Sequence, residues 1–202
     1  MSAFKKLLDV ADVLLGPNGC PWDREQTLLS LQPYLLEEAH ELIEAIDSQD
    51  PQKMKEELGD VFYTVIFIAK LAEREKLFTL FESMECMTEK LIRRHPHIFG
   101  EVKVTGSEDV MRNWEEIKMK EGRKSPFEGI PPTLPALSRA QKVVSKLRRK
   151  KAVSSRRSIL KDEKELAEKL WALVEEAECA GMDAESVLRR LCMKIEKENT
   201  GD

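Results

Sequence analysis

Cysteine and histidine are scarce in this 202-residue sequence, which has four of the first and three of the second. The cysteines Cys20, Cys86, Cys179 and Cys192 show neither a Cys-x-x-Cys motif nor a Cys/His spacing of the kind that binds zinc. This pattern fits free thiols in a reducing compartment better than a disulfide framework. The sequence therefore argues against a zinc site and against a disulfide-stabilised secreted fold.

Long apolar segments are also missing. Residues 1–15 place lysines among their apolar residues, so we expect them to form neither a signal peptide nor a membrane-spanning helix. Aromatic residues make up only 6% of the chain, whereas 35% is charged and 42% hydrophobic. This composition is typical of a helix-rich soluble protein, and we expect it to be cytoplasmic. The net charge of -4 gives no global attraction to nucleic acid or anionic lipid.

The positions of helix-starting and helix-ending residues predict helices throughout and almost no strands. We expect helices near residues 3–16, 28–47 or 33–47, 51–76, 79–95 and 107–121, followed by two or three more between 137 and 198. Residues 19–23 are expected to form a loop. We expect Asp50 to cap the third helix, Thr79 and Glu82 to form a capping box at the start of the fourth, and Ser107 to cap the fifth, which Gly122 ends. The stretch 125–136 carries four prolines and a glycine and is interpreted as a linker. The expected fold is all-α, with helical domains at 1–124 and 137–202.

Two acidic pairs, Glu38-x-x-Glu41 and Glu57-x-x-Asp60, lie on consecutive predicted helices joined by the short turn 48–51. Residues three apart share a helix face, and a short connection makes the two helices antiparallel neighbours. The four carboxylates could therefore converge into an oxygen cage for a hard cation such as Mg²⁺. Periodicity alone leaves a second interpretation open, in which the pairs are solvated outer faces of amphipathic helices.

Basic residues concentrate in the segment 142–161. No aromatic residues interleave it, so a solvated helix face, or contact with an acidic neighbour in a dimer, explains it better than nucleic-acid binding. Such a segment could also attract an anionic substrate over long range.

A weak internal repeat relates Glu57-Leu58-Gly59-Asp60 to Glu165-Leu166-Ala167-Glu168.

Several short motifs, taken together and in order, resemble one known family. They are Gly19-Cys20-Pro21-Trp22-Asp23, Pro33-Tyr34-Leu35-Leu36, Glu37-Glu38-Ala39-His40-Glu41, Glu57-Leu58-Gly59-Asp60, Arg93-Arg94-His95-Pro96-His97-Ile98-Phe99 and Trp114-Glu115-Glu116-Ile117-Lys118. The chain thus resembles the MazG-type nucleoside triphosphate pyrophosphohydrolases, which belong to the all-α NTP pyrophosphatase superfamily. The resemblance covers roughly residues 7–124, and residues 134–141 resemble the start of the second module of full-length members.

The resemblance implies a dimeric helical bundle that hydrolyses nucleoside triphosphates to the monophosphate and pyrophosphate with Mg²⁺, for which Mn²⁺ is a possible substitute. It assigns the metal to Glu38, Glu41, Glu57 and Asp60. Glu37 becomes a candidate general base, with an exposed structural carboxylate as the alternative. The phosphates are assigned to Lys90, Arg94 and Lys118, and a nucleobase stacking surface to Trp114 and Trp22. A helix C-terminal charge remains the alternative for Arg94, core packing for Trp114, and ordering of the entrance to the bundle for Trp22.

The C-terminal third departs from the family pattern. It lacks a Glu-Glu-x-x-Glu helix, has Glu168 where the first module has Asp60, and stops before any second Trp-x-x-x-Lys. We interpret residues 137–202 as a degenerate, non-catalytic second module kept for packing. The expected function is broad-specificity removal of surplus or non-canonical nucleotides. A narrower pyrimidine nucleotide pyrophosphatase, or a metal- or nucleotide-binding regulator or adaptor without turnover, remains open.

Overall fold

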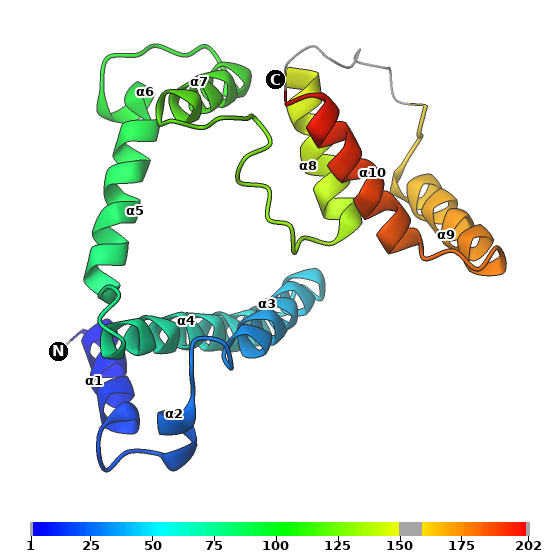
Figure 1. The fold of residues 1–202 in the computed structure, drawn as a ribbon. Coiled ribbons are helices and arrows are strands. Elements are labelled where there is room, and N and C mark those ends of the chain that lie inside the picture. Colours follow the sequence, from blue (N-terminus) through cyan, green and yellow to red (C-terminus); the bar gives the residue numbers. More distant parts are fainter. Residues whose placement is uncertain (1, 150–158, 201–202) are drawn as a thin grey trace. The chain divides into compact units, whose positions relative to one another are not determined.

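The structure is a computed structural model that describes residues 2–149 and 159–200, and within these ranges it consists of helices and contains no strand (Figure 1). The expected all-α class is therefore confirmed. The described chain forms two compact units, residues 1–93 and 94–202. No described helix is long and apolar enough to cross a membrane. The helices, in order, are α1 (Ala3–Leu15), α2 (Pro21–Glu25), α3 (Gln32–Asp47), α4 (Pro51–Arg74), α5 (Leu80–Arg94), α6 (Pro96–Phe99), α7 (Ser107–Lys120), α8 (Ala136–Arg149), α9 (Glu163–Cys179) and α10 (Ala184–Glu198).

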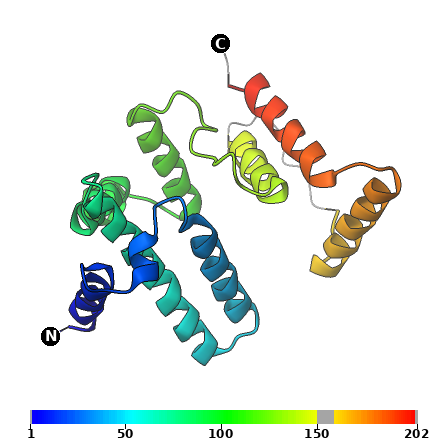
Figure 2. The ribbon, with the colours of Figure 1, turned by 60° about the horizontal axis from the view of Figure 1, so that its bottom comes forward.

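The hairpin of α3 and α4 is the centre of the first unit, and the two helices lie side by side in both ribbon views (Figures 1 and 2). Asp50 begins α4 as predicted, because its carboxylate accepts hydrogen bonds from the backbone N–H groups of Gln52 and Lys53, at 2.9 and 3.2 Å. Pro51 occupies the first turn, where its missing N–H has no cost. The short turn forces the two helices to be antiparallel neighbours.

The core of the first unit is built on the C-terminal half of α4, where the buried residues of this helix lie. Leu8 and Ala11 of α1 pack against Ile66 and Ala69 of α4, with Leu80 of α5 closing the cluster. A second cluster joins Leu31, Phe67 and Leu71. These clusters fix α4, so the residues on its first turns are held in place by apolar packing further along the same helix.

The segment 19–23 was expected to be a loop, but its second half forms the short helix α2. Gly19 allows the chain to turn here, since a Cβ atom at this position would lie 2.1 Å from the carbonyl oxygen of Leu14. Arg74 of α4 then fixes the end of α2 by donating to the carbonyl oxygens of Arg24 and Gln26, at 3.1 and 2.6 Å. Pro21 favours the start of a helix at this position. A helix of five residues is too short to show a periodic pattern in the sequence.

The capping box predicted for α5 is present. The Thr79 N–H donates to the Glu82 carboxylate at 2.6 Å, and the Glu82 N–H donates to the Thr79 hydroxyl at 3.1 Å. The helix ends at Arg94, before the His95-Pro96 dipeptide.

The start of α7 differs from the prediction. Gly106, not Ser107, is the N-cap residue, and Ser107 is already helical. Asp109 in the first turn accepts hydrogen bonds from the backbone N–H and the hydroxyl of Thr105, at 3.0 and 2.5 Å, and so ties the segment before α7 to its first turn. Gly122 lies after the end of α7 as predicted and adopts φ +96°, a conformation that favours glycine.

In the second unit, α8 and α10 pack together, and the proline-rich stretch contributes to their core. Phe127 and Ile130 are buried against Val143, Leu147 and Cys192. The predicted linker therefore packs on α8 and α10. Of the basic segment 142–161, residues 150–158 lie outside the described residues.

A buried ion pair joins α8 to α10. The Arg139 side chain, only 8% exposed, donates two hydrogen bonds of 2.8 Å to the two carboxylate oxygens of Glu196. Near the other end of the pair, Glu185 of α10 accepts the backbone N–H of Ala136 at 2.8 Å and so caps α8. The segment that resembles the start of a second module is thus fixed by specific polar contacts.

Candidate metal centre and cationic cluster

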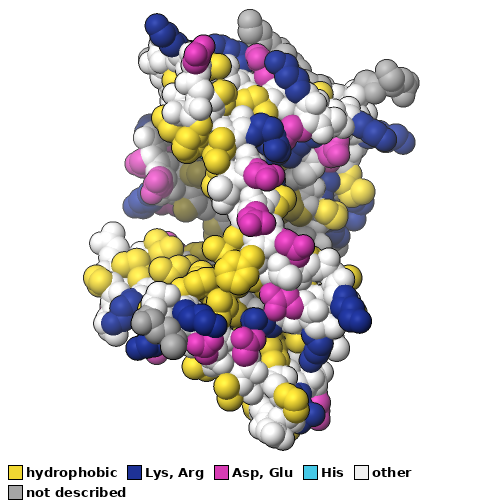
Figure 3. All heavy atoms as spheres, turned by 90° about the vertical axis from the view of Figure 1, so that its left-hand side faces the viewer, with side chains coloured by type: hydrophobic (Ala, Val, Ile, Leu, Met, Phe, Trp, Pro, Cys, Tyr) yellow, Lys and Arg dark blue, Asp and Glu magenta, His cyan; other side chains and the backbone are white. Residues whose placement is uncertain are grey.

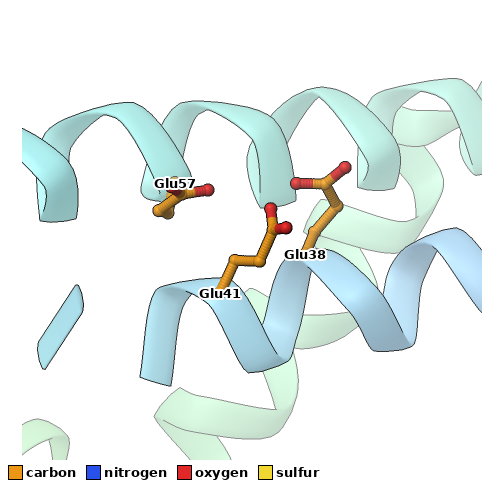
Figure 4. Close-up of side chains that lie close together, drawn as sticks. All are labelled: Glu38, Glu41 and Glu57. Carbon is orange, nitrogen blue, oxygen red and sulfur yellow. The ribbon is translucent and has the colours of Figure 1, made fainter. Parts of the chain in front are cut away.

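Three carboxylates meet between α3 and α4. Glu38 and Glu41 extend from α3 and Glu57 from α4, and Figure 4 shows them pointing toward one another across the hairpin. One carboxylate oxygen from each lies within 4.8 Å of the others. Glu38 and Glu57 are half-buried, and Glu41 is exposed. Among the described residues, this is the one group of three or more carboxylate, histidine or cysteine side chains found at such spacing.

Asp60, the fourth predicted ligand, lies on α4 one turn after Glu57 but is not among the three carboxylates within 4.8 Å of one another. It is nevertheless close enough for its charge to raise the pKa of both Glu38 and Glu57. The sequence prediction thus places all four acids in one region, and the structure brings three of them into direct proximity.

The electrostatics of the cluster show an excess of negative charge. Burial is the largest cause that raises the pKa of Glu38, and the charges of Asp60, Glu41 and Glu57 raise it further. The pKa of Glu57 is raised by burial and then by Glu41 and Asp60, while Lys53 opposes the shift. Lys53 is itself 3.2 Å from Glu44. A divalent cation would relieve this repulsion, and carboxylate oxygens are the donors that hard cations prefer.

Glu37 precedes this group by one residue and is exposed on α3. Its charge also raises the pKa of Glu38, so it lies within electrostatic reach of the cluster. Its side chain is not part of the three-carboxylate group. This position fits a group that acts beside a metal better than one that ligates it.

A second cluster, in the unit 94–202, brings together three further predicted site residues. Trp114 on α7 lies beneath two cations, with the Lys118 amine 5.4 Å and the Arg94 guanidinium carbon 5.9 Å from its ring centre. The edge of the His95 ring contacts the same indole, with the centroids 4.8 Å apart. Arg94 also forms a two-pronged ion pair with Glu121.

The two remaining candidates, Lys90 and Trp22, belong to the first unit. Lys90 is half-buried on α5, one turn before Arg94. Trp22 on α2 is 49% exposed and packs edge-to-face against Tyr34 of α3, with ring centroids 5.6 Å apart. This contact ties α2 to α3 and leaves about half of the Trp22 surface accessible.

Sequence reasoning missed a carboxylate, Glu115, that organises the cations around α7. Its carboxylate lies 3.4 Å from the Lys118 amine, 3.5 Å from that of Lys146 and 3.1 Å from the Arg149 guanidinium. The spacing of Glu115 and Lys118 along one helix is visible in the sequence. The contribution of Lys146 and Arg149 from α8 depends on the packing of α8 near α7 and has no local signal.

A sequence model of the MazG nucleotide pyrophosphohydrolase domain matches residues 26–99, the stretch that holds α3, α4 and α5. The nucleoside triphosphate pyrophosphohydrolase/pyrophosphatase MazG of Thermotoga maritima is 37% identical over an alignment of length 216, which covers 95% of this chain and 82% of that protein. The chain belongs to the MazG family.

Other MazG relatives match a smaller part of their own length. The nucleoside triphosphate pyrophosphohydrolase of Escherichia coli K12 is 40% identical over 148 residues, which cover 71% of this chain and 56% of that protein. The uncharacterized protein YabN of Bacillus subtilis is 46% identical over 143 residues, covering 69% of this chain and 29% of that protein. This chain therefore spans less than two thirds of the length of both.

A solved MazG-family structure supports the helical fold. The crystal structure of a mazG-related protein from Thermotoga maritima matches with a TM-score of 0.51 and 30% sequence identity. The match covers 57% of this chain and 98% of that one. The resemblance deduced from the sequence motifs is thus confirmed at the level of family and fold.

Proposed function

We propose that this chain hydrolyses nucleoside triphosphates to nucleoside monophosphate and pyrophosphate in a Mg²⁺-dependent reaction, with broad tolerance of the base. One observation carries the proposal: Glu38, Glu41 and Glu57 converge with uncompensated charge on the hairpin inside the matched MazG region. Relatives from two bacteria carry the name nucleoside triphosphate pyrophosphohydrolase, which supports the same reaction.

Glu38, Glu41, Glu57 and Asp60 would hold the metal, for which Mg²⁺ is the first choice and Mn²⁺ a substitute. When bound, such an ion neutralises phosphate charge and polarises the phosphoryl centre, a contribution of several kcal/mol. Three hard oxygen donors within 4.8 Å of one another, with raised pKa values for Glu38 and Glu57, are the features that fit it. We assign Glu37 to accept the proton of the attacking water, since it is exposed beside the cluster.

The triphosphate is assigned to Lys90, Arg94 and Lys118, which supply the positive charge that an acidic metal site lacks. Arg94 is held by Glu121 and would have to exchange this carboxylate for a phosphate oxygen. The base is assigned to the faces of Trp114 and Trp22, because stacking on an aromatic ring tolerates every base. This assignment would allow a broad substrate range without base-specific hydrogen bonds.

We also propose that the chain acts as a homodimer. Apolar side chains gather on the exposed surface of the molecule (Figure 3). In the first unit they follow three consecutive helices: Leu36, Ile43 and Ile46 on α3, Leu58, Phe62 and Val65 on α4, and Phe81, Met84, Met87 and Leu91 on α5. Exposed apolar faces of this extent are typical of protein interfaces. A second copy of the chain would cover them, with residues 137–202 serving as a non-catalytic packing module.

The dimer proposal is checked by sedimentation velocity of wild-type protein and a Met84→Glu variant. We expect a dimer for the wild type and a shift toward monomer for the variant. A monomeric wild type at micromolar concentration would contradict the assembly without touching the proposed reaction.

The four cysteines are free thiols in the structure, which fits the proposed cytoplasmic location.

The alternative of a regulator without turnover predicts Mg²⁺ and nucleotide binding with no product.

The reaction is tested by measuring pyrophosphate release from each common ribo- and deoxyribonucleoside triphosphate with Mg²⁺. Wild type is compared with Glu41→Gln and Asp60→Asn, and Glu56→Gln serves as the matched control because Glu56 is an exposed acid beside Glu57. We expect release by wild type and by the control, and loss in both cage variants. Folded, Mg²⁺-binding protein that releases no pyrophosphate from any substrate would favour the regulator.

A further inference from the structure

A pocket of about 770 Å³ lies between α7 and α8, entirely within the second unit. Its volume falls in the range of roughly 300–1,000 Å³ that is usual for sites of small-molecule ligands. Trp114 and Ile130 contribute apolar surface to its lining. The acidic residues of the α3–α4 hairpin are not among the residues that line it.

The charge of the pocket is strongly one-sided. Its lining carries five cationic side chains and a single carboxylate: Lys118, Arg123, Lys142, Lys146, Arg149 and Glu115. The side chains of Lys118 and Lys146 are only 16% and 13% exposed, so water compensates little of their charge. The pocket is therefore built for a ligand that brings several negative charges.

Glu115 cannot neutralise this group by itself. It already contacts three cations, at distances of 3.1 to 3.5 Å. Burial is the largest cause that lowers the pKa of Lys118 and of Lys146, and the charge of Arg123 lowers both further despite Glu115. The cations thus repel one another, and an anion entering the pocket would relieve that repulsion.

Arg123 is positioned by a close approach to the backbone. A Cβ atom at Gly129 would lie 2.8 Å from the Arg123 guanidinium nitrogen Nη2, and Gly129 has φ +83°. The Arg123 guanidinium therefore lies directly against Gly129. Glycine is suited to this position because it accepts the positive φ of the turn and has no side chain to displace the guanidinium. A planar guanidinium beside two amines suits phosphate oxygens.

We propose that this pocket binds a condensed phosphate, the pyrophosphate or triphosphate group, and that Lys146 and Arg149 of α8 are phosphate-binding residues of this chain. Two sources share this chemistry: the triphosphate of the substrate, which rests on the proposed function, and free inorganic pyrophosphate, which does not. In either case the Glu115 carboxylate is ion-paired with Lys118, Lys146 and Arg149 until the phosphate replaces it.

The test uses inorganic pyrophosphate and the full chain in isothermal titration calorimetry with EDTA present. Without divalent cations the acidic α3–α4 hairpin does not attract an anion. The pyrophosphate binding that is measured in EDTA is therefore assigned to the cationic pocket. We expect saturable binding by wild type that is weakened roughly tenfold in Lys146→Gln and in Arg149→Gln, as for the loss of a charge-assisted hydrogen bond. Circular dichroism and thermal melts establish that each variant is folded.

Two controls sharpen the result. Lys194→Gln removes one positive charge from α10, where the side chain is 72% exposed and outside the pocket, and should leave affinity within about twofold. Glu115→Gln removes the competing carboxylate and should tighten binding by about fivefold or more. A purely structural Glu115 predicts the opposite, since its loss would disorder the cations and weaken binding.

No saturable binding by wild type would overturn the proposal. So would equal affinity in Lys146→Gln, Arg149→Gln and Lys194→Gln, or weaker binding in Glu115→Gln. None of these results bears on pyrophosphate release by wild type, so failure of the pocket and failure of the proposed function are distinguishable.

Steady-state kinetics then assign the source. If the substrate triphosphate occupies the pocket, Lys146→Gln raises KM about tenfold and leaves kcat within about twofold. If free pyrophosphate occupies it, KM is unchanged and inhibition of the reaction by added pyrophosphate is lost. Both results support the pocket, and they separate its role in substrate binding from a role in product control.

Discussion

Replacing Glu38 by Gln should stabilise the metal-free protein and destabilise the Mg²⁺-bound one. In the absence of metal, Glu38 lies against Glu41 and Glu57, and its raised pKa reflects burial and the negative charge around it. The amide of Gln keeps the shape of the side chain and removes the charge. The variant therefore loses a repulsive interaction in EDTA and a metal ligand in Mg²⁺.

The size of the gain follows from the geometry. Carboxylate oxygens of Glu38 and Glu41 lie within 4.8 Å of each other. Two unit charges at that distance repel by roughly 0.9 kcal/mol at the dielectric constant of water, and physiological salt reduces this to about 0.5 kcal/mol. We expect the free energy of unfolding in EDTA to rise by roughly 0.5–0.9 kcal/mol for this pair.

The loss in Mg²⁺ is larger and has the opposite sign. An ion at about 100 times its dissociation constant stabilises the wild type by about 2.7 kcal/mol. If the missing carboxylate weakens binding about hundredfold, the variant retains only about 0.4 kcal/mol of this. The order of stability of wild type and variant should therefore reverse between EDTA and Mg²⁺.

Urea unfolding followed by circular dichroism measures both values, with Glu56→Gln as the control for removing an exposed acid from the same hairpin. The control should show no reversal, and the urea dependence should be unchanged in all proteins. A Glu38→Gln variant that is less stable than wild type in EDTA, or equally stabilised by Mg²⁺, would refute the account of an uncompensated metal site.

Further predictions concern capping, pH and the second unit. Thr79→Ala should cost about 1 kcal/mol of stability through loss of the capping box at α5, measured by urea unfolding, with no change in Mg²⁺ affinity. Hydrogen bonds from the Thr105 side chain and then its backbone lower the pKa of Asp109 to about 2. The stability that this carboxylate contributes is therefore full above its unfolded pKa and is lost as pH falls through about 2. Asp109→Asn should destabilise the protein at pH 6, and the difference from wild type should shrink as the pH of the unfolding measurement is lowered toward 2. Glu196→Gln should cost roughly 3–5 kcal/mol, because it leaves the buried Arg139 guanidinium without its anion; a loss below about 1 kcal/mol in thermal unfolding would contradict this.

The sequence was most informative where the determinants are local. The α3–α4 hairpin could be predicted because Asp50-Pro51 marks the start of a helix and the acidic pairs recur at a spacing of three. The short helix α2 escaped prediction because five residues show no periodicity. The start of α7 was misassigned by one residue because its N-cap is Gly106, which has no side chain to signal a cap.

The determinants that depend on packing could not be predicted. Periodicity could not decide whether the acidic faces of α3 and α4 meet each other or water, and only the folded hairpin shows Glu38, Glu41 and Glu57 together. The contacts of Glu115 with Lys146 and Arg149 join residues more than thirty positions apart. That residues 1–124 form the catalytic domain and residues 137–202 a non-catalytic module remains a prediction. The proline-rich stretch between them packs on α8 and α10.

The most direct test of the central claim is identification of the products of ATP with Mg²⁺ by phosphorus-31 NMR, for wild type and Glu41→Gln. The account predicts AMP and pyrophosphate in equal amounts from wild type, no product in EDTA, and none from a folded Glu41→Gln variant. ADP and inorganic phosphate as the products, or full activity in Glu41→Gln, would contradict it.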